Sequence, residues 1–201
     1  MNSVKLSAED ISKLKEKMHK HIQENCLITD GDFALSAGSG SSYYFDCKKA
    51  TLDGAFLNAF AQYVCEFIVP QLPEQPDVVG GLTLGADFIT AAIVMYSSAN
   101  NGSIPQGSIV RKEPKKHGTK SRIENETGKD NAAGGKNVLV VEDVITSGAS
   151  IAKACDEFLA AGYNPVGMLT VVDRDAGGIE ALEKKYGIKV WALFSPSDFT
   201  I

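Results

Sequence analysis

The residues with the clearest chemical potential lie in one run, VLVVEDVITSGAS, which begins at Val138. Its leading apolar residues are typical of a buried strand, and two acids, Glu142 and Asp143, follow them directly. A turn of small and polar residues, 146–150, comes next. Because ligands collect at the carboxyl ends of parallel strands, we expect the acids and the turn to form one binding site.

The turn and the acids favour different parts of a ligand. The first amides of a helix are unpaired and carry the positive end of its dipole, so a backbone of small residues at 146–150 can wrap a phosphate. Glu142 and Asp143 repel a phosphate and need sugar hydroxyls or a hydrated Mg²⁺. A ribose 5-phosphate satisfies both halves. In the alternative interpretation, the acids are a solvated strand end and the turn only caps a helix.

A basic segment, RKEPKKHGTKSR, runs from Arg111 to Arg122 and directly follows a predicted strand. It holds six Lys or Arg against one Glu, whereas the whole chain has a net charge of −5, so the other 189 residues carry −10. Such a run is usually a solvated turn, and a nucleic-acid patch is a further alternative. No aromatic residues are interleaved for base stacking, which argues against RNA. The position after a strand favours a small anionic ligand.

The rest of the sequence supplies the elements that must position these residues. Helical spacing after a capping box of Ser7 and Asp10 predicts a first helix over about 7–25. Two short β-like runs, FAL and YYFD, indicate a hairpin or a pair of strands between 33 and 46. Thr51 is expected to cap a second helix, whose apolar stripe is Phe56, Phe60, Val64 and Phe67.

From residue 77 onward, strand and helix patterns alternate. Strands are predicted at 77–82, 107–111, 137–142, 165–172 and 188–194, and helices at 86–98, 149–161 and 179–186. The alternation indicates an α/β domain with a mostly parallel central sheet flanked by helices. The segment 112–136 does not fit this rhythm and is predicted to be a long flexible loop.

Composition limits the class of protein. With 201 residues and 44% hydrophobic content, the chain is expected to form a single domain over 1–201. The N-terminus lacks a secretory signal, and the longest apolar run is too short to span a bilayer. Four cysteines without a CxxC pair indicate reduced thiols. We therefore expect a cytoplasmic protein that binds neither membranes nor, given its acidic charge, nucleic acid.

The run VEDVITSGAS resembles the phosphoribosyl-pyrophosphate (PRPP) loop of the type I phosphoribosyltransferases. Three further segments are similar to the orotate phosphoribosyltransferase family in particular. RKEPKKHG, from Arg111, resembles its mobile catalytic loop, Val172–Arg174 its Asp-Arg pair, and residues 33–46 the segment that closes over the base. Two positions depart from the family, because Ser36 and Leu84 stand where lysine is common.

The resemblance implies a type I phosphoribosyltransferase-like fold with a small N-terminal hood, over about 1–50, and a mobile catalytic loop at 112–136. It implies transfer of the phosphoribosyl group of PRPP to orotate, giving orotidine 5′-monophosphate and pyrophosphate in uridine monophosphate biosynthesis. The implied cofactor is Mg²⁺, held mainly by PRPP and near the acid pair. A homodimer is implied, in which the catalytic loop reaches the neighbouring subunit, together with a separate orotidylate decarboxylase for the next step.

The residues implied by the resemblance fall into three groups. The catalytic residues are Lys115, His117 and Asp143. The PRPP-binding residues are Arg111, Lys112, Lys115, His117, Glu142, Asp143, Val144, Ile145, Thr146, Ser147, Gly148, Ala149 and Ser150. The orotate-binding residues are Thr146, Arg174, Tyr44 and Phe45.

Several alternatives stay open at the level of sequence. Arg174 can instead form a surface ion pair with Asp173 or Asp175, and Tyr44 and Phe45 can be core residues of a hairpin. A phosphoribosyltransferase that salvages purines or other nucleobases is a second enzyme hypothesis. A PRPP-sensing regulator that binds nucleic acid on the same fold is a third.

Overall fold

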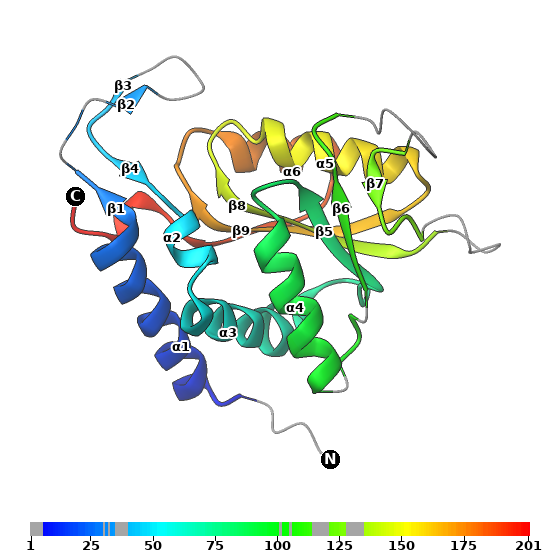
Figure 1. Cartoon of the computed structure of the whole chain (residues 1–201), viewed down its shortest axis with the longest axis horizontal. Helices are drawn as coiled ribbons and strands as arrows, with labels where there is room; N and C mark the ends of the chain where they lie inside the picture. The colour runs from blue at the N-terminus through cyan, green and yellow to red at the C-terminus, as the bar shows by residue number, and fades with distance from the viewer. Residues whose placement is uncertain are drawn as a thin grey trace.

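A computed structural model of the chain describes residues 6–29, 31, 33–34, 40–100, 102–104, 106–113, 121–127 and 135–201. In these residues the main sheet has six strands in the order β10-β9-β8-β5-β6-β7 (Figure 1). Its parallel strands are β5 (Val78–Leu82), β6 (Gln106–Val110), β8 (Asn137–Ile145), β9 (Asn164–Asp173) and β10 (Val190–Phe194). The short β7 (Ile123–Glu124) runs antiparallel beside β6. The predicted α/β fold with a mostly parallel sheet is confirmed.

Helices cover both faces of the sheet, which explains why its strands are apolar on both sides. On one face lie α3 (Gly54–Tyr63) and α4 (Asp87–Ala99), with α1 (Ala8–His21) packed against α3. On the other lie α5 (Ala149–Ala160) and α6 (Gly178–Tyr186) (Figure 1). Successive residues of β8 alternate between the two cores: Leu139 and Val141 face the α4 side, whereas Val138 and Val140 face the α5 side.

The chain reverses direction across the sheet between β5 and β8. After β5 it forms β6 on one side and then returns to place β8 on the other side of β5. Pairing of β8 with β5 runs only as far as Gly80 and Val140, whereas pairing with β9 continues to Ile145 and Asp173. A crevice at such a switch point is the usual ligand site of an open α/β sheet. Glu142 and Asp143 lie in the part of β8 that extends beyond its pairing with β5.

The N-terminal part packs over the α3 and α4 face and carries two small antiparallel pairs. The predicted capping box of Ser7 and Asp10 is confirmed at α1, which passes into a π-helical turn, Ile22–Cys26. β1 (Leu27–Ile28) pairs with β4 (Tyr44–Phe45), and β2 (Phe33–Ala34) pairs with β3 (Gly40–Ser41). Of the two alternatives for FAL and YYFD, the hairpin was wrong, whereas each run does contain a strand, and the two strands have different partners.

A four-residue helix, α2 (Lys48–Thr51), connects β4 to α3. Thr51 is buried at its end and does not cap the next helix, contrary to the sequence prediction. Asp53 has this role, since its carboxylate accepts a hydrogen bond from the Phe56 amide at 2.8 Å. The predicted helix therefore begins at Gly54, and a separate short helix with Lys48 at its start precedes it.

The remaining boundaries agree with the sequence prediction to within a few residues, except that β8 extends three residues further, to Ile145. β7 lies inside the segment 112–136, which was predicted to be a loop throughout. Within the described part of the chain, no helix combines the length and the apolar character needed to span a bilayer. The four cysteines are free thiols, as expected.

Candidate active site at the switch point

The turn after β8 forms a hollow at the N-terminus of α5. Gly148 precedes the helix with a left-handed φ of 77°, and no side chain caps the helix. A Cβ at Gly148 would also lie 2.9 Å from Leu182, so both the backbone conformation and the space require glycine. The first intrahelical bond runs from the Ala152 amide to the Gly148 carbonyl, and the amides before it face outward.

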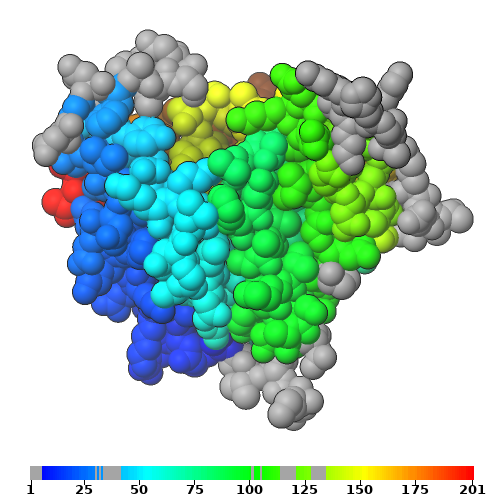
Figure 2. All heavy atoms as spheres, viewed as in Figure 1, coloured from blue at the N-terminus to red at the C-terminus, as the bar shows by residue number. Residues whose placement is uncertain are grey.

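This hollow has a volume of about 240 Å³ and is formed by the predicted PRPP-binding run. Its lining residues are Glu142, Val144, Ile145, Thr146, Ser147, Gly148, Ala149, Ser150 and Ile151. Figure 2 shows the segment after β8, in yellow, at the floor of a recess between the cyan segment that contains α2 and the green segment. An uncapped helix N-terminus at such a recess is suited to bind a phosphate.

Glu142 lies at the inner wall of the hollow and is only 5% exposed. Burial and, second to it, the negative charge of Asp143 together raise the pKa of its carboxyl to about 9. Glu142 Oε1 accepts a hydrogen bond from the Asp143 amide at 3.3 Å. A Cβ at Gly85 would lie 1.6 Å from this same oxygen, so the absence of a side chain at Gly85 creates the space for the carboxylate.

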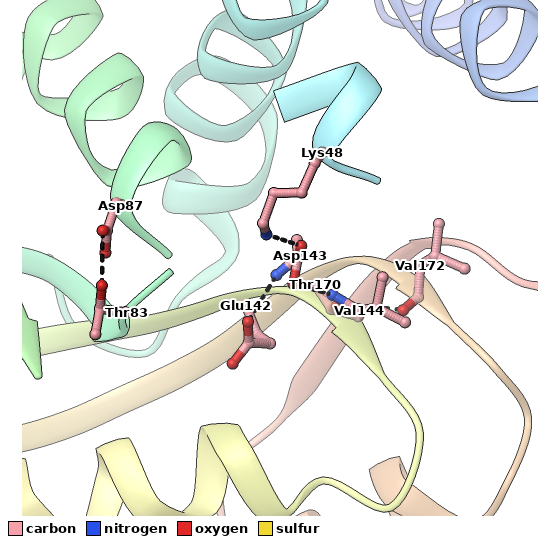
Figure 3. A network of polar contacts seen from close by, with 8 residues as sticks. All are labelled: Lys48, Thr83, Asp87, Glu142, Asp143, Val144, Thr170 and Val172. Carbon is pink, nitrogen blue, oxygen red and sulfur yellow. Dashed lines mark hydrogen bonds and ion pairs between the residues drawn. The ribbon is translucent and has the colours of Figure 1, made fainter. Parts of the chain in front are cut away.

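Asp143 points to the opposite side of β8 and is held at both oxygens. Oδ1 accepts a hydrogen bond from the Val144 amide at 3.0 Å, and Oδ2 forms a short ion pair with Lys48 Nζ (Figure 3). Lys48 comes from α2, 95 residues away in sequence. The sequence analysis did not identify Lys48, because nothing near it in the sequence except the adjacent Lys49 distinguishes it from an ordinary surface lysine. The structure therefore adds a cation to the predicted acid pair.

The connection from β5 to α4 borders the acids on the other side. Thr83 Oγ1 donates a hydrogen bond to Asp87 Oδ2 at 2.8 Å, which fixes the start of α4 (Figure 3). Leu84, at a position where the family often has lysine, is 51% exposed. Ser36, the other departure, lies outside the described residues.

Arg174 follows β9, the neighbour of β8, and lies at the same edge of the sheet. Its amide donates to the Ile145 carbonyl at 2.9 Å, and its side chain is buried, with 8% exposure. Nη2 donates to the Tyr43 carbonyl at 3.0 Å, and the guanidinium lies 4.9 Å from the centre of the Tyr43 ring. The adjacent Asp173 has its pKa raised to about 6, first by burial and then by the charge of Asp175. Arg174 is thus a buried residue at the same edge of the sheet as Glu142 and Asp143.

The aromatic residues of the hood have different environments. Phe45 is buried in the core, with the centre of its ring 5.2 Å from that of Phe199. For Phe45, this agrees with the alternative prediction of a core residue. Tyr44 is 43% exposed and stacks on Phe33 with ring centres 5.6 Å apart. Tyr43, which the sequence did not single out, is the residue that contacts Arg174. Only Tyr44 of the predicted pair has a ring exposed enough to meet a base.

The basic segment begins at the end of β6. Arg111 forms an ion pair with Glu124 of β7 at 2.8 Å, and the Lys112 carbonyl accepts a hydrogen bond from Lys153 of α5 at 3.0 Å. The segment therefore starts beside the N-terminal half of the helix that forms the hollow. Lys115 and His117, the predicted catalytic residues of this loop, lie outside the described residues.

The described residues contain no group of three His, Cys, Asp or Glu side chains placed to hold a metal ion. A buried and a partly buried carboxylate beside an uncapped helix N-terminus fit a Mg²⁺ ion that its substrate carries, since Mg²⁺ commonly keeps waters and phosphate ligands. They do not fit a cage made by the protein alone.

A mostly parallel sheet with an uncapped helix N-terminus at its switch point and an acid pair at the end of the adjoining strand fits a phosphoribosyltransferase. Residues 77–196 match the family model described as "Phosphoribosyl transferase domain". The chain is 39% identical over 191 residues to the orotate phosphoribosyltransferase of Nostoc sp., covering 94% of this chain and 86% of the relative. It is 40% identical over 190 residues to that of Aquifex aeolicus, covering 92% and 96%. The chain belongs to the orotate phosphoribosyltransferase family.

Solved structures agree with this assignment. The Mycobacterium tuberculosis orotate phosphoribosyltransferase in complex with Fe(III) dicitrate matches with a TM-score of 0.71 and 32% identity, over 94% of this chain and 98% of that chain. The same enzyme in complex with PRPP matches with a TM-score of 0.67 and 26% identity, over 96% and 93%.

Proposed function

We propose that the protein transfers the phosphoribosyl group of PRPP to orotate, releasing pyrophosphate and giving orotidine 5′-monophosphate for uridine monophosphate synthesis. One observation carries this proposal: Glu142 of β8 and the uncapped N-terminus of α5 line one hollow, and Asp143 is the next residue along the strand. Such a hollow suits a ligand with a phosphate at one end and a diol beside it. Membership of the orotate phosphoribosyltransferase family supports the same reaction.

In this proposal the 5-phosphate binds the amides and hydroxyls of 146–150, and the ribose hydroxyls bind Glu142 and Asp143. Orotate attacks C1′ through N1 in its deprotonated form. The N1–C1′ bond forms as the bond from C1′ to pyrophosphate breaks, and the electron pair leaves with pyrophosphate. Positive charge that develops at C1′ is stabilised by the nearby acids. Their roles are binding and electrostatic, because the deprotonated N1 needs no general base.

Orotate recognition is assigned to Arg174, Thr146 and Tyr44. The planar guanidinium of Arg174 can make two parallel hydrogen bonds to the orotate carboxylate, a geometry that lysine cannot provide. Its burial removes competing water, and its contact with Tyr43 fixes its plane. Phe45 is left out of direct stacking because of its place in the core.

Stabilisation of the leaving group is assigned to the basic segment. Its cationic side chains neutralise pyrophosphate, and these are Arg111, Lys112, Lys115 and His117. Mg²⁺, when bound with PRPP, adds a positive charge on the pyrophosphate oxygens. Because the charge of the leaving group grows in the transition state, the loop is expected to lower the barrier more than it tightens ground-state binding.

We further propose a homodimer in the cytoplasm, with the loop of one subunit reaching the site of the other. Two observations support an interface: Leu52, Leu84 and Met95 are exposed, and an apolar hollow of about 230 Å³ lies between α3 and α4. A separate orotidylate decarboxylase would consume the product. Mixing Lys115→Ala with Asp143→Asn subunits tests the shared site, because exchange would restore about a quarter of the sites. No recovery with demonstrated subunit exchange would refute it.

Turnover with orotate, adenine, guanine and uracil at fixed PRPP and Mg²⁺ tests the choice of base. We expect pyrophosphate release with orotate and not with the others. A preference for a purine would favour the salvage enzyme, and tight nucleic-acid binding without turnover would favour the regulator.

A further inference from the structure

We propose that Lys48 is a positioning residue of the phosphoribosyl site, which holds the Asp143 carboxylate in the orientation that accepts the ribose hydroxyls. The inference rests on the proposed function, since it deepens the role of the acid pair. Lys48 is the first residue of α2, and its ammonium bridges from the N-terminal part of the chain to the centre of the sheet (Figure 3).

The contact fixes a carboxylate that otherwise has freedom to rotate. One Asp143 oxygen accepts the Val144 amide at 3.0 Å, and Lys48 holds the other. The two partners lie on different elements, so together they define the plane of the carboxylate. Ribose hydroxyls need an acceptor whose lone pairs already point at them, because immobilising it during binding costs affinity.

The surroundings of the pair give a reason for a cation at this place. Glu142 and Asp143 are adjacent in sequence, and their carboxylates approach each other around Gly85, at 1.6 and 2.8 Å from the position of a Cβ there. Without a nearby positive charge, two acids this close would repel each other and be pushed apart. The charge of Lys48 acts on both of them. The lysine thus supplies a positive charge beside two adjacent acids, one of which lines the hollow.

The pair differs from the surface ion pairs of the protein. Its side chains are 32% and 15% exposed, whereas those of Lys13 and Glu9 on α1 are 66% and 75% exposed. A partly buried pair of this kind loses much of its attraction to desolvation and is a weak source of stability. A role in ordering the site accounts for the contact better than a role in folding.

The closing experiment compares Lys48→Met with Lys49→Met. Both changes remove one charge from the same short helix, but Lys49 is exposed and no ion pair of it is seen among the described residues. PRPP affinity is measured by calorimetry with Mg²⁺, without any base. Lys48→Met is expected to weaken PRPP binding by roughly 10- to 100-fold, the usual effect of removing a group that orients a ligand-binding side chain. Lys49→Met should stay within about twofold, and Lys48→Arg should recover most of the affinity.

A double-mutant cycle shows whether Lys48 acts through Asp143. Asp143→Asn should weaken binding, and adding Lys48→Met to it should cause little further loss. The double variant also avoids an unpaired buried carboxylate, so it keeps the test valid if Lys48→Met alone folds poorly. Additive losses, or equal affinities of the Lys48→Met and Lys49→Met variants, would overturn the inference.

The outcome is separable from that of the proposed function. If the wild-type protein binds PRPP but does not turn over orotate, the choice of base is refuted. The role of Lys48 can then still be tested by measuring PRPP affinity. A wild-type protein that does not bind PRPP with Mg²⁺ refutes both, because no ribose site then exists for Lys48 to organise.

Discussion

Replacing Glu142 with glutamine should stabilise the protein at neutral pH while lowering its activity. Glu142 is buried, and its carboxyl pKa is raised from 4.5 to about 9. A group whose pKa is higher in the folded state stabilises that state fully only below its unfolded pKa. Its contribution is lost as pH rises from 4.5 toward 9. Glutamine resembles the protonated acid in shape and does not titrate, so the Glu142→Gln variant escapes this loss.

The magnitude follows from the displaced pKa. Each pH unit inside the window changes the relative stability by about 1.4 kcal/mol. Between pH 5 and pH 7, the stability difference between Glu142→Gln and the wild type should therefore grow by roughly 2 to 3 kcal/mol in favour of the variant. This exceeds the effect of an ordinary surface substitution.

Urea denaturation at pH 5, 6 and 7 measures this difference directly, with the slopes compared to confirm that the same surface unfolds. Glu16→Gln is the matched control, because Glu16 is exposed on α1 and a surface substitution there should change the free energy of unfolding by no more than about 0.5 kcal/mol. A Glu142→Gln variant that is less stable than the wild type at pH 7, or a gain that is equal at all three pH values, would contradict the assigned burial. The expected loss of activity follows because glutamine, unlike the acid, cannot ionise in response to the positive charge that develops at C1′.

Four further predictions concern the site. Gly85→Ala should lower kcat/KM by roughly 10- to 100-fold, because its Cβ would displace the Glu142 carboxylate, whereas Gly54→Ala, with open space around the new methyl, should leave kinetics unchanged. Arg174→Lys should raise KM for orotate by roughly tenfold or more and leave PRPP affinity unchanged in calorimetry. Tyr43→Leu should raise the same KM about 3- to 30-fold by removing the ring beneath the guanidinium. Lys115→Ala should lower kcat far more than it weakens PRPP binding, and a loss confined to binding would argue against a transition-state role.

The α/β fold and the residues that line the hollow after β8 could be predicted from the sequence because both depend on local patterns. A run such as Val138–Val141 is apolar on every residue, as a parallel strand buried on both faces must be. The order of strand, acids and small turn is likewise contiguous, so the members of the hollow could be named from the sequence alone. The limits of β8 were less visible, because Ile145 is kept in the strand by its neighbour β9.

Features that depend on contacts between distant segments were missed. Lys48 meets Asp143 across 95 residues and Tyr43 meets Arg174 across 131, and no spacing rule connects such positions. The hairpin between FAL and YYFD was wrong for the same reason, since short strands select partners by tertiary packing and β4 pairs with β1. Tyr44 and Phe45 were both predicted to bind the base because both are aromatic. Residue type alone could not distinguish them, since Tyr44 is exposed and Phe45 is in the core.

The most direct test of the account is pyrophosphate release by the wild-type protein with PRPP, in the presence and absence of orotate and of Mg²⁺, beside the Asp143→Asn variant. The account predicts release that requires both orotate and Mg²⁺ and that falls sharply in the variant, with weaker PRPP binding as well. Release without orotate, or an Asp143→Asn variant with unchanged binding and rate, would contradict the assignment of the β8 acids to the ribose of PRPP.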